Sequence, residues 1–564
     1  MSKAFKVTLI FMLAFIFAVA MVYASGGEKG GGGSAEKAAG PIQYKYLKWY
    51  DDGSVDLITF EDNEVIHLTK KDLGNLFGKG KQPFKGKRIA VTVNNGGPKG
   101  GISGPLYRIR PAWEELTGAK LDIVEMPLAE QLQKTINDLR LGGGQYDGFV
   151  EGAWYMGEYV TPGFIIPLDK YVENPDYPYW NPDWLPKSLK NIYTWGGKWY
   201  AVPNDSDGQV LYWRNDILSD PEWQKKYKKE TGKDMPFPIK TWDDVIAIAK
   251  FFNGKNWDNN DPDPDNGIVM HFKVNAQGMF HYMSLSAPYV VMPRDKVDKS
   301  TVYWFDPDTM KPLINSPGHV KALDVLYRLQ KYGPPAQASW DLGTAWDWFL
   351  RGKAIFVFSW GDVGELVQDT KRSKIKGKLG ASILPGTYDV YDLDTNSWVH
   401  LDKPNVVGNT TGGSWQGVVS VKSKNPDVVY SLFALMATKP FHIWNVNRGW
   451  TGVDPGWITD FLPPDGTADL KGYLDAGWNE SDLKFFLKAY HDNFFAKHML
   501  SYLRINGTDE YWRTLDQNLN ACMIGKITPQ EALDRTAREW DEITDRRGRE
   551  DQLKQYQEAI GYKK

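Results

Sequence analysis

The sequence predicts an α/β protein made of two large lobes or three smaller domains. Strands and helices alternate from residue 88 onward at spacings typical of βαβ units. The same alternation begins again with new elements after residue 216. A chain of 564 residues is also too long for one ordinary hydrophobic core.

The first half of the chain shows the alternation clearly. We expect a β-branched strand over 88–93, followed by a helix near 106–117. A second strand over 119–127, a glycine-ended helix over 130–144 and a third strand within 145–156 come next. This order predicts a parallel sheet, and ligands of such sheets bind beyond the carboxyl ends of the strands.

Polar and aromatic residues follow these strands, and they are the candidate binding residues. The stretch "KWYAVPNDSDGQVLYWRND", residues 198 to 216, places two carboxylates between two aromatic runs. The candidates from this half of the chain are Asn95 (beside Asn94), Glu151, Trp154, Asp205, Asp207 and Tyr212.

The second half predicts further strands and helices. A helix over 240–254 begins with Thr241 as N-cap, and a helix over 316–333 begins at Ser316. Residues 347–362 should form a helix, a glycine turn and a strand that ends in Trp360 and Asp362. Another strand and helix follow within 410–438, and Thr528 with Glu531 has capping-box spacing in the helical C-terminal region.

The N-terminus has the layout of a secretory signal. Lys3 and Lys6 precede an uncharged apolar run from Val7 to Val22, so we expect a signal peptide over residues 1–24. An uncleaved membrane anchor is the alternative, because the run is near the lower length limit of a spanning helix. Residues 25–41 are rich in glycine and should form a flexible tether.

Composition narrows the function classes. The formal charge is −3, from 67 basic and 70 acidic residues, so a nucleic acid or an anionic membrane is not expected as a partner. The only cysteine, Cys522, excludes an internal disulfide. The 24 tryptophans suggest that some indoles serve as flat apolar binding faces.

Seven motifs in one order carry a family resemblance between about residues 84 and 545. They are "GFIIPLDKYV", "WYAVPNDSDGQVLYWRNDIL", "IKTWDDVIAIAKFF", "FLRGKAIFVFSWGD", "GASILPG", "GGSWQGVVSVKSKNPD" and "GKITPQEAL". This order resembles the extracellular solute-binding proteins of bacterial ABC importers, and more narrowly the carbohydrate-binding, maltose-binding-protein-like branch. The longer form is also similar to the polyol- and glycerol-binding members.

The resemblance implies a type II periplasmic binding protein fold, with two α/β lobes joined by hinge-crossing strands. On this basis the N-terminal lobe should comprise 42–206 plus 360–415 and the C-terminal lobe 207–359 plus 416–545, with a helical tail over 546–564. It also implies a monomeric, non-enzymatic protein of the periplasm or cell exterior. The protein would capture a sugar, oligosaccharide or polyol in its cleft and deliver it to the membrane permease, without a cofactor.

The resemblance also places binding residues in the cleft. Asp207 matches the crossing-strand carboxylate, Trp360 an aromatic after a strand, and Trp512 an aromatic platform on a C-terminal helix. Carboxylates accept paired hydroxyl hydrogen bonds, and aromatic rings cover the C–H faces of a sugar. Further candidates are Trp415, which lies beside a crossing, and Asp362. Arg448 is also a candidate, and for this residue a surface ion pair is the alternative. Core packing for the indoles, and turn formation for Asp205 and Asp207, are the other structural alternatives.

Two other interpretations stay open. An exported glycoside hydrolase also uses tryptophan-lined clefts and paired carboxylates, and a surface lectin would fit the tether. The alternating Asp261, Asp263 and Asp265 resemble a calcium loop, but Gly267 is one place late and the bidentate glutamate is missing. A solvated loop is the better interpretation, and we expect no metal site.

Overall fold

The computed structural model describes residues 43–94, 98–257, 261–412, 414–449, 452–500 and 502–563. The expected signal peptide, the expected tether and Asn95 lie outside these residues. Within the described residues, no helix combines the length and the apolar character needed to span a bilayer.

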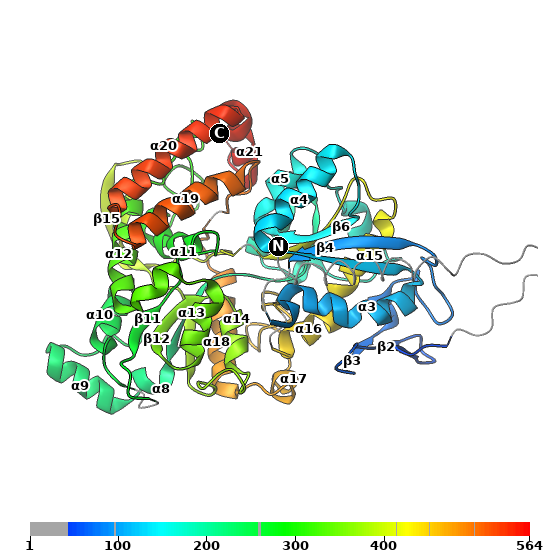
Figure 1. The fold of residues 1–564 in the computed structure, drawn as a ribbon, viewed down its shortest axis with the longest axis horizontal. Coiled ribbons are helices and arrows are strands. Elements are labelled where there is room, and N and C mark those ends of the chain that lie inside the picture. The colour runs from blue at the N-terminus through cyan, green and yellow to red at the C-terminus, as the bar shows by residue number, and fades with distance from the viewer. Residues whose placement is uncertain are drawn as a thin grey trace, which may run out of the picture. The chain divides into compact units, whose positions relative to one another are not determined.

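One five-stranded sheet organises the first half of the fold (Figure 1). Its strands run in the order β5-β4-β6-β16-β9. The neighbours of β4 are both parallel to it, as predicted, whereas β16 is antiparallel to β6 and β9. The strands are β4 (Arg88–Asn94), β5 (Lys120–Met126), β6 (Gly148–Gly152), β9 (Ala201–Pro203) and β16 (Trp415–Val419). The helices that contact this sheet include α3 (Gly104–Thr117), α4 (Leu128–Leu141) and α15 (Pro426–Met436).

A second, four-stranded sheet has the order β11-β12-β10-β13. Strand β10 is central and pairs antiparallel with β12 and β13, and every residue of β10 and β12 is buried. The strands are β10 (Val210–Arg214), β11 (Asn266–Val269), β12 (Ala354–Ser359) and β13 (Leu379–Ile383). Helices that contact it include α10 (Trp242–Phe252), α13 (Leu342–Leu350) and α18 (Glu480–Phe494), and α12 (Pro317–Leu329) packs on α10.

Smaller elements complete the fold. A three-stranded antiparallel sheet, β1 (Leu47–Trp49), β2 (Val55–Ile58) and β3 (Val65–Leu68), packs on α3 and α16 (Lys439–Asn447). The other helices are α2 (Lys70–Leu73), α5 (Met156–Val160), α6 (Asp169–Val172), α7 (Lys187–Tyr193), α8 (Asn215–Leu218), α9 (Pro221–Thr231), α11 (Met279–Val290), α14 (Asp362–Val367), α17 (Leu470–Asp475), α19 (Thr508–Met523), α20 (Pro529–Arg547) and α21 (Arg549–Ile560). The other strands are β7 (Thr194–Trp195), β8 (Lys198–Trp199), β14 (Thr387–Asp392) and β15 (Ser397–Asn405). Five 3₁₀ turns lie between these elements in the described part of the chain, from η2 (Pro98–Ser103) to η6 (Pro335–Ser339).

The chain passes between the two sheets through segments that are hydrogen-bonded to each other. Residues 204–209 connect β9 to β10, and residues 406–414 connect β15 to β16. The buried Asn409 joins them: its Oδ1 accepts from the Gln209 amide at 2.8 Å, and its Nδ2 donates to the Gln209 carbonyl at 2.9 Å. Asn493 Nδ2 donates to the Asn409 carbonyl at 2.7 Å, which ties α18 to the same point.

The structure differs from the predicted lobe boundaries. The sequence-based division put residues 360–415 in the N-terminal lobe, but β13, inside that range, pairs with β10 of the second sheet. It put residues from 416 onward in the C-terminal lobe, but β16 and α15 belong with the first sheet. The predicted boundary at residue 360 puts the change of lobe directly after β12, whereas the chain returns to the first sheet only after β15.

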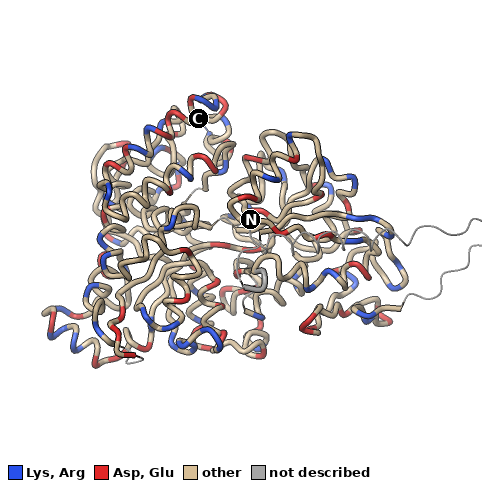
Figure 2. The backbone as a smooth tube through the Cα atoms, viewed as in Figure 1, with Lys and Arg blue, Asp and Glu red and all other residues tan. Residues whose placement is uncertain are grey.

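The residues predicted to begin helices largely do so in the structure. Thr241 and Thr528 both form capping boxes, with Asp244 and Glu531 respectively. Ser316 occupies the N-cap position of α12, but its hydroxyl pairs with His319 Nδ1 instead of a backbone amide. Basic and acidic residues are interspersed along the described chain (Figure 2), consistent with the near balance of charge.

Candidate functional site

A cavity of about 420 Å³ lies where the crossing segments meet the ends of the sheets. Strand β4 contributes Asn94, the first crossing contributes two carboxylates, and the end of β12 contributes an indole and a third carboxylate. Five of the predicted binding residues line this cavity: Asp205, Asp207, Trp360, Asp362 and Trp415.

The carboxylates are held in place by backbone amides. Asp205 Oδ1 accepts from the amides of Ser206 at 2.7 Å and Asp454 at 2.6 Å. Asp454 Oδ2 accepts from the Gly361 amide at 2.7 Å and from the Tyr490 hydroxyl at 2.8 Å. One carboxylate oxygen from each of Asp205, Asp207 and Asp454 lies within 4.8 Å of the others. Segments far apart in the sequence thus bring three buried carboxylates to one point.

Burial dominates the electrostatics of this cluster. It raises the pKa of Asp205 to about 6 and the pKa of Asp362 to about 8. The pKa values of Asp207 and Asp454 are raised well above the usual range, first by burial and then by repulsion from the neighbouring carboxylates. The cluster therefore retains protons near neutral pH unless hydrogen-bond donors or positive charge stabilise its ionised form.

Trp360 is fixed by a close approach of the second crossing. Its Nε1 donates to the Thr411 carbonyl at 2.6 Å, and its own carbonyl accepts from the Tyr212 hydroxyl at 3.0 Å. Gly412 has a φ of 104°, and a Cβ there would lie 1.8 Å from Trp360 Nε1. Both facts require glycine at position 412.

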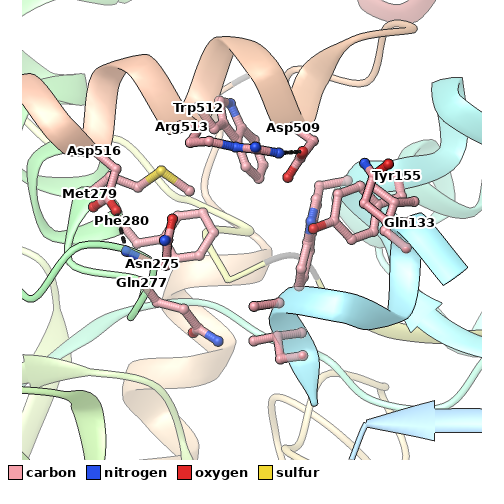
Figure 3. A pocket seen from close by; sticks show the side chains of 14 residues that line it. Gln133, Tyr155, Asn275, Gln277, Met279, Phe280, Asp509, Trp512, Arg513 and Asp516 are labelled. Carbon is pink, nitrogen blue, oxygen red and sulfur yellow. Dashed lines mark hydrogen bonds and ion pairs between the residues drawn. The ribbon is translucent and has the colours of Figure 1, made fainter. Parts of the chain in front are cut away.

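A second cavity of about 230 Å³ adjoins the first, because Leu128, Asn275 and Gln277 line both. It contains the predicted Trp154 and Trp512. Figure 3 shows Trp512, Phe280 and Met279 on one side and Tyr155 across the opening, with Arg513 directed toward Asp509. Polar groups such as Gln133 and Asp516 stand at its rim (Figure 3).

The indoles of the two cavities form one aromatic cluster. Trp154 lies 5.6 Å from Trp415 and 6.2 Å from Trp512, measured between ring centroids. Phe280 lies 5.9 Å from Trp360 and 5.4 Å from Trp512. Trp415 lies in β16 of the first sheet, and Trp154 lies in the turn directly after β6 of the same sheet. Trp360 follows β12 of the second sheet. The rings thus meet between elements of both sheets.

Three predicted residues lie elsewhere, and Asn95 is outside the described residues. Glu151 is fully buried in β6, where its Oε1 accepts from the Tyr159 hydroxyl at 2.8 Å. Tyr212 is buried behind Trp360, as described above. Arg448 pairs with Glu64 at 2.7 Å and with Asp62 at 3.1 Å, which is the surface ion pair considered as its alternative.

Several lining residues were missed from the sequence. Asp454, in "GVDPGW", had no distinguishing signal, because a single carboxylate beside glycine and proline is common in turns. Phe280 lies in α11, whose every residue is buried apart from Met279, so no apolar face marks it as a lining residue. Asn94 ends β4 and carries the same sequence signal as its predicted neighbour Asn95.

The segment with Asp261, Asp263 and Asp265 is neutralised in part by a lysine side chain. Lys353 Nζ lies 2.8 Å from Asp261 Oδ1 and 2.6 Å from Asp265 Oδ1, and it donates to the Asp263 carbonyl at 3.3 Å. The lysine ammonium therefore stands among the oxygens that suggested a calcium loop.

Comparison with known proteins gives a family match. The model of the bacterial extracellular solute-binding protein family matches residues 106–440, which is more than half of the chain. A probable ABC transporter-binding protein of Deinococcus radiodurans is 24% identical over 336 residues, covering 56% of this chain and 64% of that protein. A probable amino-acid ABC transporter periplasmic-binding protein of Sinorhizobium fredii is 24% identical over 48% of this chain and 56% of its own length. The chain thus spans less than two thirds of each of these curated relatives.

Solved structures share the two-lobed fold. A solute-binding protein of Agrobacterium radiobacter in complex with ribitol has a TM-score of 0.61 at 19% identity, covering 82% of this chain and 99% of that chain. One from Agrobacterium vitis with bound D-mannitol has a TM-score of 0.59 at 19% identity, with 82% and 99% covered. The maltose-bound MalE3 of T. maritima has a TM-score of 0.56 at 17% identity, with 81% and 99% covered.

Proposed function

This chain belongs to the bacterial extracellular solute-binding proteins, and from that premise we propose that it captures a sugar or polyol for an ABC importer. The solute would occupy the cavity lined by Asp205, Asp207 and the indoles of Trp360 and Trp415. The proposal also places the mature protein outside the cytoplasmic membrane, after removal of the expected signal peptide.

The observation that carries the proposal is the pairing of carboxylates with indoles in one cavity. A sugar or polyol presents hydroxyls, which donate to carboxylates in charge-assisted hydrogen bonds about twice as strong as neutral ones. It also presents C–H groups, which pack on indole faces. Solved proteins with this fold are described as bound to ribitol, D-mannitol and maltose, which supports the same solute class here.

The cavity walls suggest how capture would be signalled. Asn94 and Trp415 belong to the first sheet, and Trp360 follows β12 of the second. A solute that contacts both stabilises the arrangement in which the two sheets face each other across it. The permease would then recognise this arrangement, and release there would complete transport.

A thermal-shift screen of the full chain against sugars and polyols tests the proposal. A solute at 100 times its dissociation constant adds about 2.7 kcal/mol to the stability of the folded state. The variant Asp207→Asn should weaken the binding of any hit at least tenfold, because it replaces one carboxyl oxygen with an NH2 group that cannot accept a hydroxyl hydrogen bond. The matched control Asp183→Asn alters an exposed carboxylate on the surface and should leave the affinity unchanged.

Two results would contradict the proposal. One is the absence of any shift across the panel. The other is release of reducing sugar from oligosaccharides or glycosides, which would identify a glycoside hydrolase, whereas a binding protein returns every glycoside intact. Binding only to immobilised glycan, without binding of free sugar, would identify a lectin instead.

A further inference from the structure

The cavity of about 420 Å³ has far more acidic than basic side chains in its lining. Its described lining includes five aspartates: Asp205, Asp207, Asp341, Asp362 and Asp454. Arg372 is the one basic side chain among the described lining residues, and its guanidinium pairs with Asp347 at 2.9 Å. Among the described residues, no basic side chain forms an ion pair with Asp205, Asp207 or Asp454.

One buried carboxylate oxygen in the cluster has no donor. Asp454 is 1% exposed and lines the cavity, and its Oδ2 already accepts two hydrogen bonds. Its Oδ1 has no hydrogen-bond partner among the described residues. A buried acceptor without a donor is costly to the fold, so a donor supplied by a ligand at this point is strongly favoured.

The walls of the cavity distinguish an organic cation from a bare metal ion. Trp360 and Trp415 line it, and the faces of indole rings attract ammonium groups. The volume of about 420 Å³ is that of a small organic molecule, and a single metal ion would leave most of it empty. The apolar walls therefore fit a carbon frame, and the carboxylates fit a positive charge attached to it.

We propose that the solute carries a protonated amine on a hydroxylated carbon frame, as in an amino sugar or amino polyol. Its ammonium would lie among Asp205, Asp207 and Asp454 and donate to Asp454 Oδ1, while its hydroxyl-bearing part packs on the indoles. This inference rests on the proposed function, because it names the solute class for the same cavity.

Matched pairs of solutes that differ at one group test the inference. D-Glucamine and D-sorbitol differ only by an ammonium in place of a hydroxyl, and D-glucosamine and D-glucose differ in the same way at C2. Calorimetric titration of the full chain at pH 7 should show at least tenfold tighter binding of the charged member of a pair. Equal affinity, or tighter binding of the neutral member, overturns this inference but leaves the proposed function intact. Binding of no member, and of no other sugar or polyol, overturns both.

An isosteric variant locates the ammonium. Asp454→Asn should lower the affinity for the charged member at least tenfold and that for the neutral member less than threefold. Asp362→Asn provides a second test at a partly exposed carboxylate, should Asp454→Asn fold poorly by circular dichroism. The surface variant Asp183→Asn is the control and should preserve the charge preference. Equal loss for both members in the folded variants overturns the inference.

Calcium chloride is the remaining arm of the experiment. Stabilisation of the chain by calcium alone, reversed by EDTA, together with no response to either amine, would assign the carboxylates to a metal ion and overturn the inference. An amine response that persists in EDTA supports it.

Discussion

The buried Glu151 offers a quantitative test of the structure. Its side chain is fully buried in β6, its Oε1 accepts from the Tyr159 hydroxyl, and its Oε2 has no partner among the described residues. Burial raises the pKa of this carboxyl to about 8. In the folded protein Glu151 is therefore protonated at neutral pH.

This shift predicts how stability changes with pH. Between pH 4.5 and pH 8 the folded state holds a proton that the unfolded state releases, so the free energy of unfolding falls as pH rises. At pH 7, protonating the carboxyl costs about 1.4 kcal/mol for each of the 2.5 pH units above its ordinary pKa, or about 3.4 kcal/mol. At pH 4.5 the same cost is only about 0.4 kcal/mol.

The variant Glu151→Gln removes this cost while keeping the shape of the side chain. We expect its free energy of unfolding, relative to the wild type, to rise by about 3 kcal/mol between pH 4.5 and pH 7. Any constant penalty from the new amide cancels in this comparison. Urea titrations followed by circular dichroism at the two pH values measure it, with the exposed Glu480→Gln as control.

Two outcomes would refute the reasoning. A difference between variant and wild type that is the same at both pH values would show that Glu151 does not hold a proton in the folded state. A tenfold loss of solute affinity in Glu151→Gln would show that this side chain contacts the solute, although it lines neither cavity.

Three further substitutions separate solute contact from structural roles, each measured by calorimetry with the solute found in the screen. Trp415→Ala should weaken binding at least tenfold, because it removes an indole wall of the cavity that contains Asp205 and Asp207, and unchanged affinity would contradict this. Trp512→Ala should weaken the binding of oligosaccharides more than that of monosaccharides, because this ring lines only the adjoining cavity. Equal losses of affinity would count against one binding site that extends through both cavities. Arg448→Met should leave affinity unchanged and lower stability by no more than about 1 kcal/mol, since it removes partly exposed ion pairs with Asp62 and Glu64. A loss of affinity would place Arg448 at the solute after all.

Much of the fold follows from local patterns. Strands β4, β5 and β6 lie where their β-branched runs end in glycine or proline turns, and the parallel pairing follows from the helices between them. The prediction that Asp207, Trp360 and Trp415 share a cleft came from the family resemblance, and these residues line one cavity.

The rest could not be predicted because it depends on distant partners. The Asp454 amide reaches Asp205 across 249 positions, and nothing near residue 454 indicates this contact. Tyr212 lies in β10, which is buried on both faces, so alternation gave no direction for its side chain. The loop with Asp261 and Asp265 was ambiguous because Lys353, far along the chain, supplies its cation.

The position of the carboxylates gives the solute influence beyond its own contacts. Asp205 and Asp207 lie on the first crossing and Asp454 lies on a later segment. Folding brings these three carboxyl groups together, and they repel one another when they are ionised. Without a donor at the centre, that assembly must retain protons or bear the cost of unpaired buried charge. A solute that supplies donors to these oxygens removes both penalties at once. Its binding therefore stabilises the arrangement of the crossing segments as well as its own position, which couples occupancy of the cavity to the relation between the sheets.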